Sequence, residues 1–302
     1  MNPAMTHERM DYARYAVVPI WYYCNSACTF CMVERQLGHL PGISPEGLLK
    51  VLTTLRDEGR YDGLILSGGE VTTFPHLADY VRKAAGLDWF QVIQIQTNAR
   101  RLADEAYCRS LVAAGVNEFF VSVHGLDEVQ DAVTQAPGGF KETWAGIENI
   151  LACGAQLITN TVLTRQNVDH LPALFQALCR LPVRELHLWN YFPMAGSDSR
   201  DLLIDMKAFH WLLPDLLAIV ETAGKPLVLK GFPECLSLGA PGYFDSQFPV
   251  NLIDQAFWDN FDENGFGACP HRSVCKAKGC FGLSAAYVEK FGPERDLLAP
   301  RT

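Results

Sequence analysis

Short apolar runs alternate with amphipathic segments along the first 223 residues, and this alternation limits the folds that the chain can adopt. Most of the runs are rich in Val, Ile, Leu and Phe, which is typical of parallel strands covered on both faces. The amphipathic segment at 44–59 offers Ser44 as a helix N-cap and Pro45 at the first helical position. The expected strands lie at residues 15–21, 62–67, 90–97, 117–124, 155–164 and 183–191. The pattern predicts a β-α unit that repeats about six times.

We therefore expect an α/β fold, a partial (β/α)6 barrel of TIM type over residues 1–224. A full (β/α)8 barrel averages ~250 residues and needs two more units than the sequence offers. Ligands of such folds bind at the C-terminal ends of the strands. Polar residues that follow the strands are therefore the candidates for chemistry.

The alternation stops after Gly224. Residues 225–235 read as one more strand, and the stretch up to residue 282 is expected to be a loop because it is rich in Gly, Pro and aromatic residues. A last helix is expected over residues 283–292. We predict that residues 225–302 form a small second module, held by something other than its own hydrophobic core.

Composition and charge limit the classes of binding partner and the cellular compartment that we expect. The 302 residues carry a net charge of −9, which argues against nucleic acid or an anionic membrane as a partner. The N-terminus lacks the apolar region of a signal peptide, and no apolar run reaches the ~20 residues of a membrane span. We expect a cytoplasmic protein, and because thiols stay reduced there, its ten cysteines indicate metal binding or catalysis rather than disulfides.

Three of these cysteines, Cys24, Cys28 and Cys31, crowd into the loop after the first strand. Thiolates select zinc, Cu(I) or iron–sulfur clusters. A structural zinc site needs four ligands, whereas a [4Fe–4S] cluster held by three cysteines leaves one iron open to a further ligand. The spacing favours such a cluster. The alternatives are three incidental cysteines, or zinc with a histidine such as His39.

The spacing C-x3-C-x2-C, with Phe30 before the last cysteine, resembles the radical S-adenosylmethionine (SAM) superfamily. The resemblance covers residues 15 to about 192. It implies that the cluster binds the amino and carboxylate groups of SAM and splits it into methionine and a 5′-deoxyadenosyl radical, which takes hydrogen from a substrate. It also implies a reducing partner such as flavodoxin or ferredoxin.

The end of the second strand extends the resemblance. Gly68 and Gly69 let the backbone approach a ligand closely, and Glu70 offers a charged acceptor for an ammonium group. The family uses Gly-Gly-Glu here to hold the methionine amino group. Val71 stands where the family usually has proline.

Other strand ends supply further candidates. By resemblance, Ser122 matches a residue that hydrogen-bonds SAM. Some relatives place an arginine near Thr134 to reach the SAM carboxylate, and because it is absent here, Arg165 is the expected substitute. Asn160 and Asn190 are expected to face the same cavity or to pack within the barrel. Candidate substrate contacts are Thr97, Asn98 and His124, with a strand-end turn and a polar rim position as the alternatives.

Four more cysteines, Cys235, Cys269, Cys275 and Cys280, lie in the C-terminal module. Four thiols in a segment with few core residues favour a metal site. Their placement resembles the SPASM and shorter twitch extensions of radical SAM enzymes, which carry auxiliary clusters. A full SPASM extension has more cysteines, so we expect one auxiliary [4Fe–4S] cluster. The alternatives are a zinc site, or Cys235 as a hydrogen donor to a substrate radical.

The resemblance implies an enzyme that modifies a ribosomal peptide or a protein side chain by oxidation, cross-linking or epimerisation. A small-molecule natural-product intermediate is the alternative substrate. A non-catalytic iron–sulfur electron carrier is disfavoured because a carrier needs no Gly-Gly-Glu turn. The remaining cysteines fall in helical patterns and are expected in the core: Cys108, Cys153 and Cys179.

Overall fold

The computed structural model describes residues 9–194, 196–237, 239–277 and 279–301. In these residues one parallel sheet has the strand order β7-β6-β5-β4-β3-β2-β1-β8. Its strands are β1 (Tyr15–Trp21), β2 (Gly63–Gly68), β3 (Val92–Thr97), β4 (Glu118–Ser122), β5 (Gln156–Leu163), β6 (Glu185–Asn190), β7 (Leu227–Lys230) and β8 (Val250–Asn251). The expected α/β fold, a curled partial barrel of parallel strands, is confirmed.

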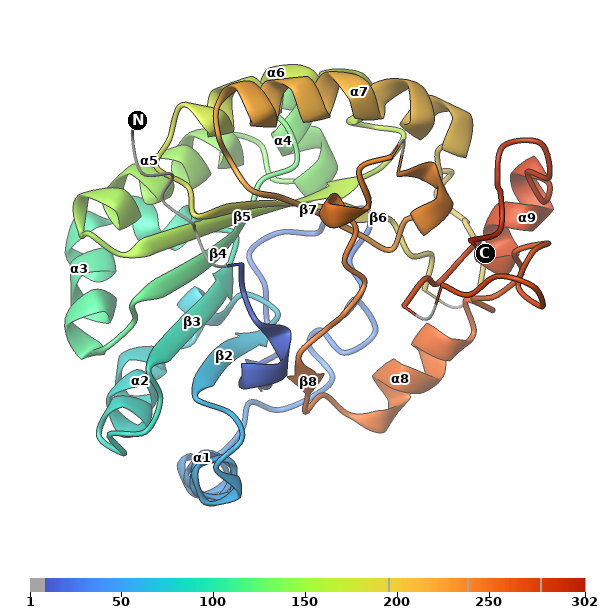
Figure 1. The fold of residues 1–302 in the computed structure, drawn as a ribbon. Coiled ribbons are helices and arrows are strands. Elements are labelled where there is room, and N and C mark those ends of the chain that lie inside the picture. Colours follow the sequence, from blue (N-terminus) through green and yellow to red (C-terminus); the bar gives the residue numbers. More distant parts are fainter. Residues whose placement is uncertain (1–8, 195, 238, 278, 302) are drawn as a thin grey trace, which may run out of the picture.

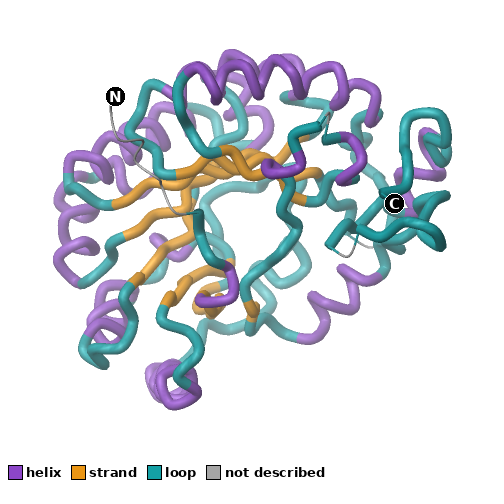
Figure 2. The backbone as a smooth tube through the Cα atoms, viewed as in Figure 1, coloured by secondary structure: helices purple, strands orange, loops and turns teal. Residues whose placement is uncertain are grey.

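Helices cover the outside of the curled sheet, and the strands surround an interior (Figures 1 and 2). The helices are α1 (Pro45–Glu58), α2 (Leu77–Ala85), α3 (Glu105–Ala114), α4 (Asp127–Thr134), α5 (Gly139–Ala152), α6 (Leu171–Cys179), α7 (Met206–Thr222), α8 (Gln255–Asp262) and α9 (Ala285–Phe291). The start of α1 is as predicted, because Ser44 caps it by accepting a hydrogen bond from Gly47 N. None of these helices is long and apolar enough to cross a membrane.

The sheet extends beyond residue 224, where the sequence predicted a separate module. β7 pairs with β6, and β8 pairs with β1 at the opposite edge of the sheet. Residues 225–302 therefore contribute two strands to the same sheet. α9 confirms the expected last helix, whereas α8 lies in a stretch that was expected to be a loop.

The strands divide the apolar residues between two clusters. On β1, Ala16, Val18 and Ile20 face the helices and belong to the main core. Tyr15 and Val17 point the other way, into an inner cluster with residues from β2, β4 and β5. Because side chains alternate along a strand, every strand presents one set of residues to the interior of the barrel.

Candidate active site

The cysteine loop lies between β1 and α1, at the C-terminal end of β1. Hydrogen bonds to two other elements fix its path. Ala27 N donates to Thr134 O at 3.0 Å and Thr29 N donates to Val133 O at 3.0 Å, so the loop is tied to the end of α4. Arg100 Nη1 also donates to the carbonyl of Asn25. The three thiols therefore sit on a loop that is held from both sides.

The end of β2 packs directly on the start of this loop. Gly69 N donates to Trp21 O and Glu70 N donates to Tyr23 O, both at 2.7 Å. A Cβ atom at Gly68 would lie 2.1 Å from Trp21 O, and one at Gly69 would lie 2.4 Å from Tyr23 O. Both positions therefore require glycine, which explains the Gly-Gly pair in physical terms.

Glu70 is buried, and its carboxylate is the centre of a hydrogen-bond network. Oε1 accepts from Thr72 N at 3.0 Å, Thr72 Oγ1 at 2.6 Å and Thr97 Oγ1 at 2.7 Å. Oε2 accepts from Asn98 N at 2.6 Å. Burial raises the pKa of Glu70, although the hydrogen bonds oppose this effect. Oε1 already accepts three hydrogen bonds, whereas Oε2 accepts one and can accept another from a ligand.

Thr97 and Asn98 lie at the cavity, but their polar groups already have protein partners. The Thr97 hydroxyl donates to Glu70, and Asn98 Nδ2 donates to Asn25 Oδ1 at 2.7 Å. Their role as substrate contacts stays a prediction, because both residues line the cavity. These residues position Glu70 and the cysteine loop, because their side chains point along the strand-end surface toward those neighbours.

A cavity of about 210 Å³ joins these strand ends to the cysteine loop. Its lining contains every residue predicted for the first site except Arg165: Cys24, Cys28, Phe30, Cys31, Gly68, Gly69, Glu70, Thr97, Asn98, Ser122 and His124. Asn160 and Asn190 line it too, as expected. Asn160 Oδ1 is buried there without a hydrogen-bond partner among the described residues, so the site offers a free acceptor to a ligand.

A family model described as the Radical SAM superfamily matches residues 18–178, which include the cysteine loop and the Gly-Gly-Glu turn. The chain belongs to the radical SAM superfamily. Among curated proteins it is 31% identical over 152 residues to the AdoMet-dependent heme synthase of Methanosarcina barkeri, covering 49% of this chain and 43% of that protein. It is 29% identical over 189 residues to the GTP 3′,8-cyclase of Mycolicibacterium smegmatis, covering 60% of this chain and 52% of that protein. The chain thus spans about half the length of these curated relatives.

Solved structures share the fold at low sequence identity. Streptococcus suis SuiB bound to its precursor peptide SuiA superposes with a TM-score of 0.61 and 15% identity, covering 96% of this chain and 67% of that one. The enzyme anSMEcpe with bound AdoMet gives a TM-score of 0.58 and 16% identity, covering 71% of this chain and 63% of that one. At these identities the likeness establishes the fold alone.

The donor set of the cysteine loop fits the [4Fe–4S] cluster that the radical SAM family implies. Thiolates are soft ligands that suit an iron–sulfur cluster, and three of them leave one iron open to a further ligand. Burial raises the pKa of Cys28 and of Cys31 to about 12, so without metal these thiols are neutral. No three His, Cys, Asp or Glu side chains within the described ranges are already arranged as a metal site. Ligation therefore requires the thiols to deprotonate.

His124 lies in the cavity of about 210 Å³ as a neutral, oriented side chain. Its ring packs edge-on against Phe30 with centroids 4.5 Å apart. Burial lowers the pKa of His124 to about 3, and Nδ1 accepts a hydrogen bond from Val162 N at 3.1 Å. The neutral ring therefore carries its proton on Nε2.

Arg165 is not among the residues that line the cavity of about 210 Å³. Its guanidinium forms an ion pair with Asp201, and 61% of its side chain is exposed. Arg165 N donates to Leu202 O, which fixes the chain next to the loop before α7. In the structure this side chain follows the loop toward the surface, and its role in binding the SAM carboxylate stays a prediction.

In the C-terminal module, backbone N–H groups donate hydrogen bonds to two of the four cysteine thiols. Cys280 Sγ accepts from Glu234 N at 3.5 Å and from Gly282 N at 3.3 Å. Burial raises the pKa of Cys235, and the charges of Cys280 and Cys269 add to the rise. Cys275 Sγ accepts from Arg301 N at 3.3 Å.

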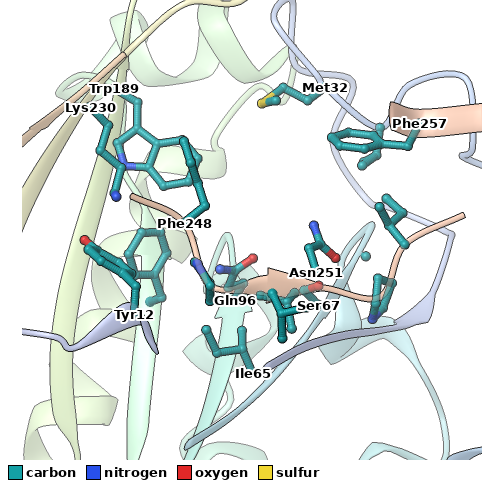
Figure 3. A pocket seen from close by; sticks show the side chains of 18 of the residues that line it. Tyr12, Met32, Ile65, Ser67, Gln96, Trp189, Lys230, Phe248, Asn251 and Phe257 are labelled. Carbon is teal, nitrogen blue, oxygen red and sulfur yellow. The ribbon is translucent and has the colours of Figure 1, made fainter. Parts of the chain in front are cut away.

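A larger cavity of about 610 Å³ fills the barrel interior and adjoins the cavity of about 210 Å³. The two cavities share Met32, Val33, Gly68, Gln96 and Trp189. Figure 3 shows the larger cavity with Met32 on one side and Tyr12, Lys230 and Phe248 on another. The sequence analysis missed Lys230 as a site residue, although a lysine that ends the apolar run 227–230 was a visible signal.

Proposed function

We propose that this chain is an enzyme that cleaves SAM reductively and abstracts hydrogen from a substrate in the barrel interior. One observation supports this most: the cysteine loop and the Gly-Gly-Glu turn line a single cavity that continues into the larger one. When bound, a [4Fe–4S] cluster would supply the electron that splits SAM. A reducing partner such as flavodoxin or ferredoxin would then reduce the cluster again.

The residues of the chain then have separate tasks. Cys24, Cys28 and Cys31 would hold the cluster. Glu70 Oε2 would accept from the methionine ammonium group, and Asn160 Oδ1 offers a further unpaired acceptor. Ser122 and the ring of Phe30 complete the wall of the SAM cavity. Neutral His124 would donate from Nε2 without adding charge.

The test uses protein reconstituted anaerobically with iron and sulfide, a chemical reductant and SAM. The wild type is expected to form 5′-deoxyadenosine, and a Cys24/Cys28/Cys31→Ala variant is expected to form none. A Cys108/Cys153/Cys179→Ala variant, which loses the same number of thiols from helical positions, is the matched control and should retain the activity. A fully loaded wild type that never cleaves SAM would favour the electron-carrier alternative.

For the substrate we propose a ribosomal peptide or a protein side chain, changed by oxidation, cross-linking or epimerisation. The support is the solved relative SuiB, which is bound to a precursor peptide and matches 96% of this chain. A small molecule is the second candidate, because the curated relatives are named for heme synthesis and GTP cyclisation. Incubation in deuterated buffer with candidate peptides, followed by mass spectrometry, separates loss of two hydrogens from exchange of one.

We also propose that residues 225–302 hold one auxiliary [4Fe–4S] cluster in a SPASM-like or twitch-like module. The ligands would be Cys235, Cys269, Cys275 and Cys280, and the hydrogen bond from Glu234 N, the residue before Cys235, to Cys280 Sγ supports this. Zinc at this site, or Cys235 as a hydrogen donor, are the alternatives. We place the protein in the cytoplasm, where its thiols stay reduced.

A further inference from the structure

The barrel interior has a strongly apolar and aromatic lining. The rings that line the cavity of about 610 Å³ include Tyr12, Phe120, Trp189, Phe248, Phe257 and Phe281. Trp189 and Phe248 meet edge-on with centroids 5.4 Å apart, and Phe248 stacks on Phe281 at 5.9 Å. A cavity of this kind favours a ligand with an apolar or aromatic body.

Lys230 places a positive charge inside this lining. It is the last residue of β7 and its side chain is 0% exposed. Nζ lies 3.7 Å from the centre of the Tyr12 ring and 4.6 Å from that of Phe248 (Figure 3). It donates one hydrogen bond, to Gln247 O. No carboxylate in the described part of the chain lies within ion-pair distance of Lys230, so two of its three donors have no acceptor there.

Other polar atoms in the same lining also lack partners. Tyr12 Oη, Gln94 Oε1 and Asn251 Oδ1 are buried and form no hydrogen bond with the described residues. Each belongs to a residue that lines the cavity. Buried polar groups are rarely left unpaired in folded proteins. These atoms, together with Lys230, therefore indicate a ligand that carries polar groups on an apolar body.

We propose that Lys230 binds a carboxylate of the substrate, and that this substrate has an aromatic body held between Trp189, Phe248 and Tyr12. The cation–π contacts hold the ammonium group in place, and the carboxylate would take the two free donors. An aromatic acid anchored there would extend toward Met32, next to Cys31. This inference rests on the proposed function, because it names the substrate class of the same site.

A purely structural role for Lys230 is the competing interpretation. In that case the ammonium group only joins β7 to Gln247 and the two rings, and the negative charges of Asp245 and Glu185 in its surroundings are enough to keep it charged. The two interpretations differ in one measurable respect. Only a substrate site discriminates between a carboxylate and the neutral amide of the same shape.

The experiment measures binding by calorimetry to reconstituted holoenzyme, independently of SAM cleavage. The probes are 3-phenylpropionate against 3-phenylpropanamide, and N-acetyl-Gly-Phe with a free or amidated C-terminus. We expect at least one acid to bind about tenfold or more tightly than its amide. Tighter binding of 3-phenylpropionate than of the dipeptide acid points to a small-molecule substrate. Tighter binding of N-acetyl-Gly-Phe with a free C-terminus points to a peptide carboxylate.

Variants assign the preference to Lys230. Lys230→Met should bind acid and amide equally, Lys230→Arg should keep part of the preference, and Lys50→Met, which removes an exposed lysine on α1, should keep all of it. Equal binding of acids and amides by the wild type, failure to bind any of the acids, or a preference that survives Lys230→Met would overturn the proposal. If SAM cleavage fails while the acid preference holds, the proposed function fails and this binding site stands.

Discussion

Glu70 forms hydrogen bonds with three separate segments of the candidate active site. Its carboxylate accepts hydrogen bonds from Thr72, Thr97 and Asn98, which lie after β2 and at the end of β3. Its backbone N donates to Tyr23 O at the start of the cysteine loop. Through its side chain and its backbone, this one residue connects two strand ends to the loop that carries the thiols.

Glu70→Ala is expected to lower the free energy of unfolding by about 3 kcal/mol and to abolish SAM binding, because buried donors lose their acceptor. Urea denaturation of the metal-free protein and equilibrium dialysis with labelled SAM measure the two effects. Glu148→Ala, which removes an exposed glutamate from α5, is the matched control and should leave both unchanged. SAM binding that survives Glu70→Ala would remove Glu70 from the binding site.

Lys230 makes binding to the barrel interior depend on pH. Burial lowers the pKa of Lys230 to about 8, while Asp245 and Glu185 oppose that effect. His187 also faces this region, and burial lowers its pKa, so it is neutral in the alkaline range. The pKa of Tyr12 is raised by burial, so it stays neutral as well. Lys230 is therefore the group in this lining that loses its charge near pH 8.

The affinity for an acid that binds at Lys230 should therefore fall about tenfold per pH unit above pH 8, while amide binding stays constant. The folded-state pKa lies below the ordinary value of 10.5, so the same group makes the free energy of unfolding rise with pH between about 8 and 10.5. Calorimetry from pH 7 to about 9.5, with Lys230→Met as the comparison, checks the first effect. A flat acid affinity over this range would contradict the assignment.

At the scale of residues, the sequence predicted which side chains gather at the site better than what each one does. Cys24, Glu70 and Ser122 line the cavity because each follows a parallel strand, and strand ends meet at one edge. Spacing could not show that Asn98 binds the cysteine loop, or that Arg165 turns to Asp201. Those outcomes depend on loop paths that bring distant residues together.

At the scale of elements, the site depends on close contact between the end of β2 and the end of β1. The two strands pair in parallel, and their register shifts between Pro19 and Trp21. Beyond that shift, Gly68 lies with φ of +134° against the carbonyl of Trp21. The strand ends can meet only because no side chain separates them.

Gly68→Ala is expected to lower the free energy of unfolding by more than about 3 kcal/mol and to reduce iron loading of the cysteine loop, since the new Cβ would collide with backbone. Gly59→Ala tests the effect of a positive φ alone, because Gly59 has φ of +68° and a Cβ there would meet nothing within 4 Å. For this variant the free energy of unfolding is expected to fall by only about 1 kcal/mol. Denaturant titration and iron analysis of both variants give the comparison. Equal effects would mean that backbone conformation, not the contact with Trp21, is what Gly68 provides.

Two elements, β8 and α8, were not predicted, because neither has a hydrophobic periodicity that could reveal it in the sequence. β8 has two residues, too few for any alternation, and its pairing with β1 joins positions more than 230 residues apart. α8 lies among Gly, Pro and aromatic residues that suggested a loop, yet Asp254 caps it by accepting from Phe257 N. By contrast, the first six strands have long apolar runs, and all were predicted from them.

At the scale of the whole molecule, residues after 224 join the barrel to the second cysteine cluster. β7 and β8 extend the sheet, and Phe281, which follows Cys280, lines the barrel interior. Arg35 in the cysteine loop donates to Asn260 on α8. The proposed auxiliary module and the SAM site thus meet across one shared interior.

Removal of the second cluster should leave the first intact. Reconstituted wild type is expected to hold about eight irons, and Cys269/Cys280→Ala about four, with SAM cleavage retained but turnover of substrate lost. Iron and sulfide analysis with a 5′-deoxyadenosine assay measures this. Four irons in the wild type, together with one bound zinc, would make the C-terminal site structural.

The central claim is that SAM binds to an open iron beside Cys24, Cys28 and Cys31. The most direct measurement is the electron paramagnetic resonance spectrum of the reduced Cys269/Cys280→Ala variant, which isolates this cluster, before and after addition of SAM. We expect a [4Fe–4S] signal that changes shape when SAM is added. A signal that stays the same, or one that survives replacement of the three cysteines by alanine, would contradict it.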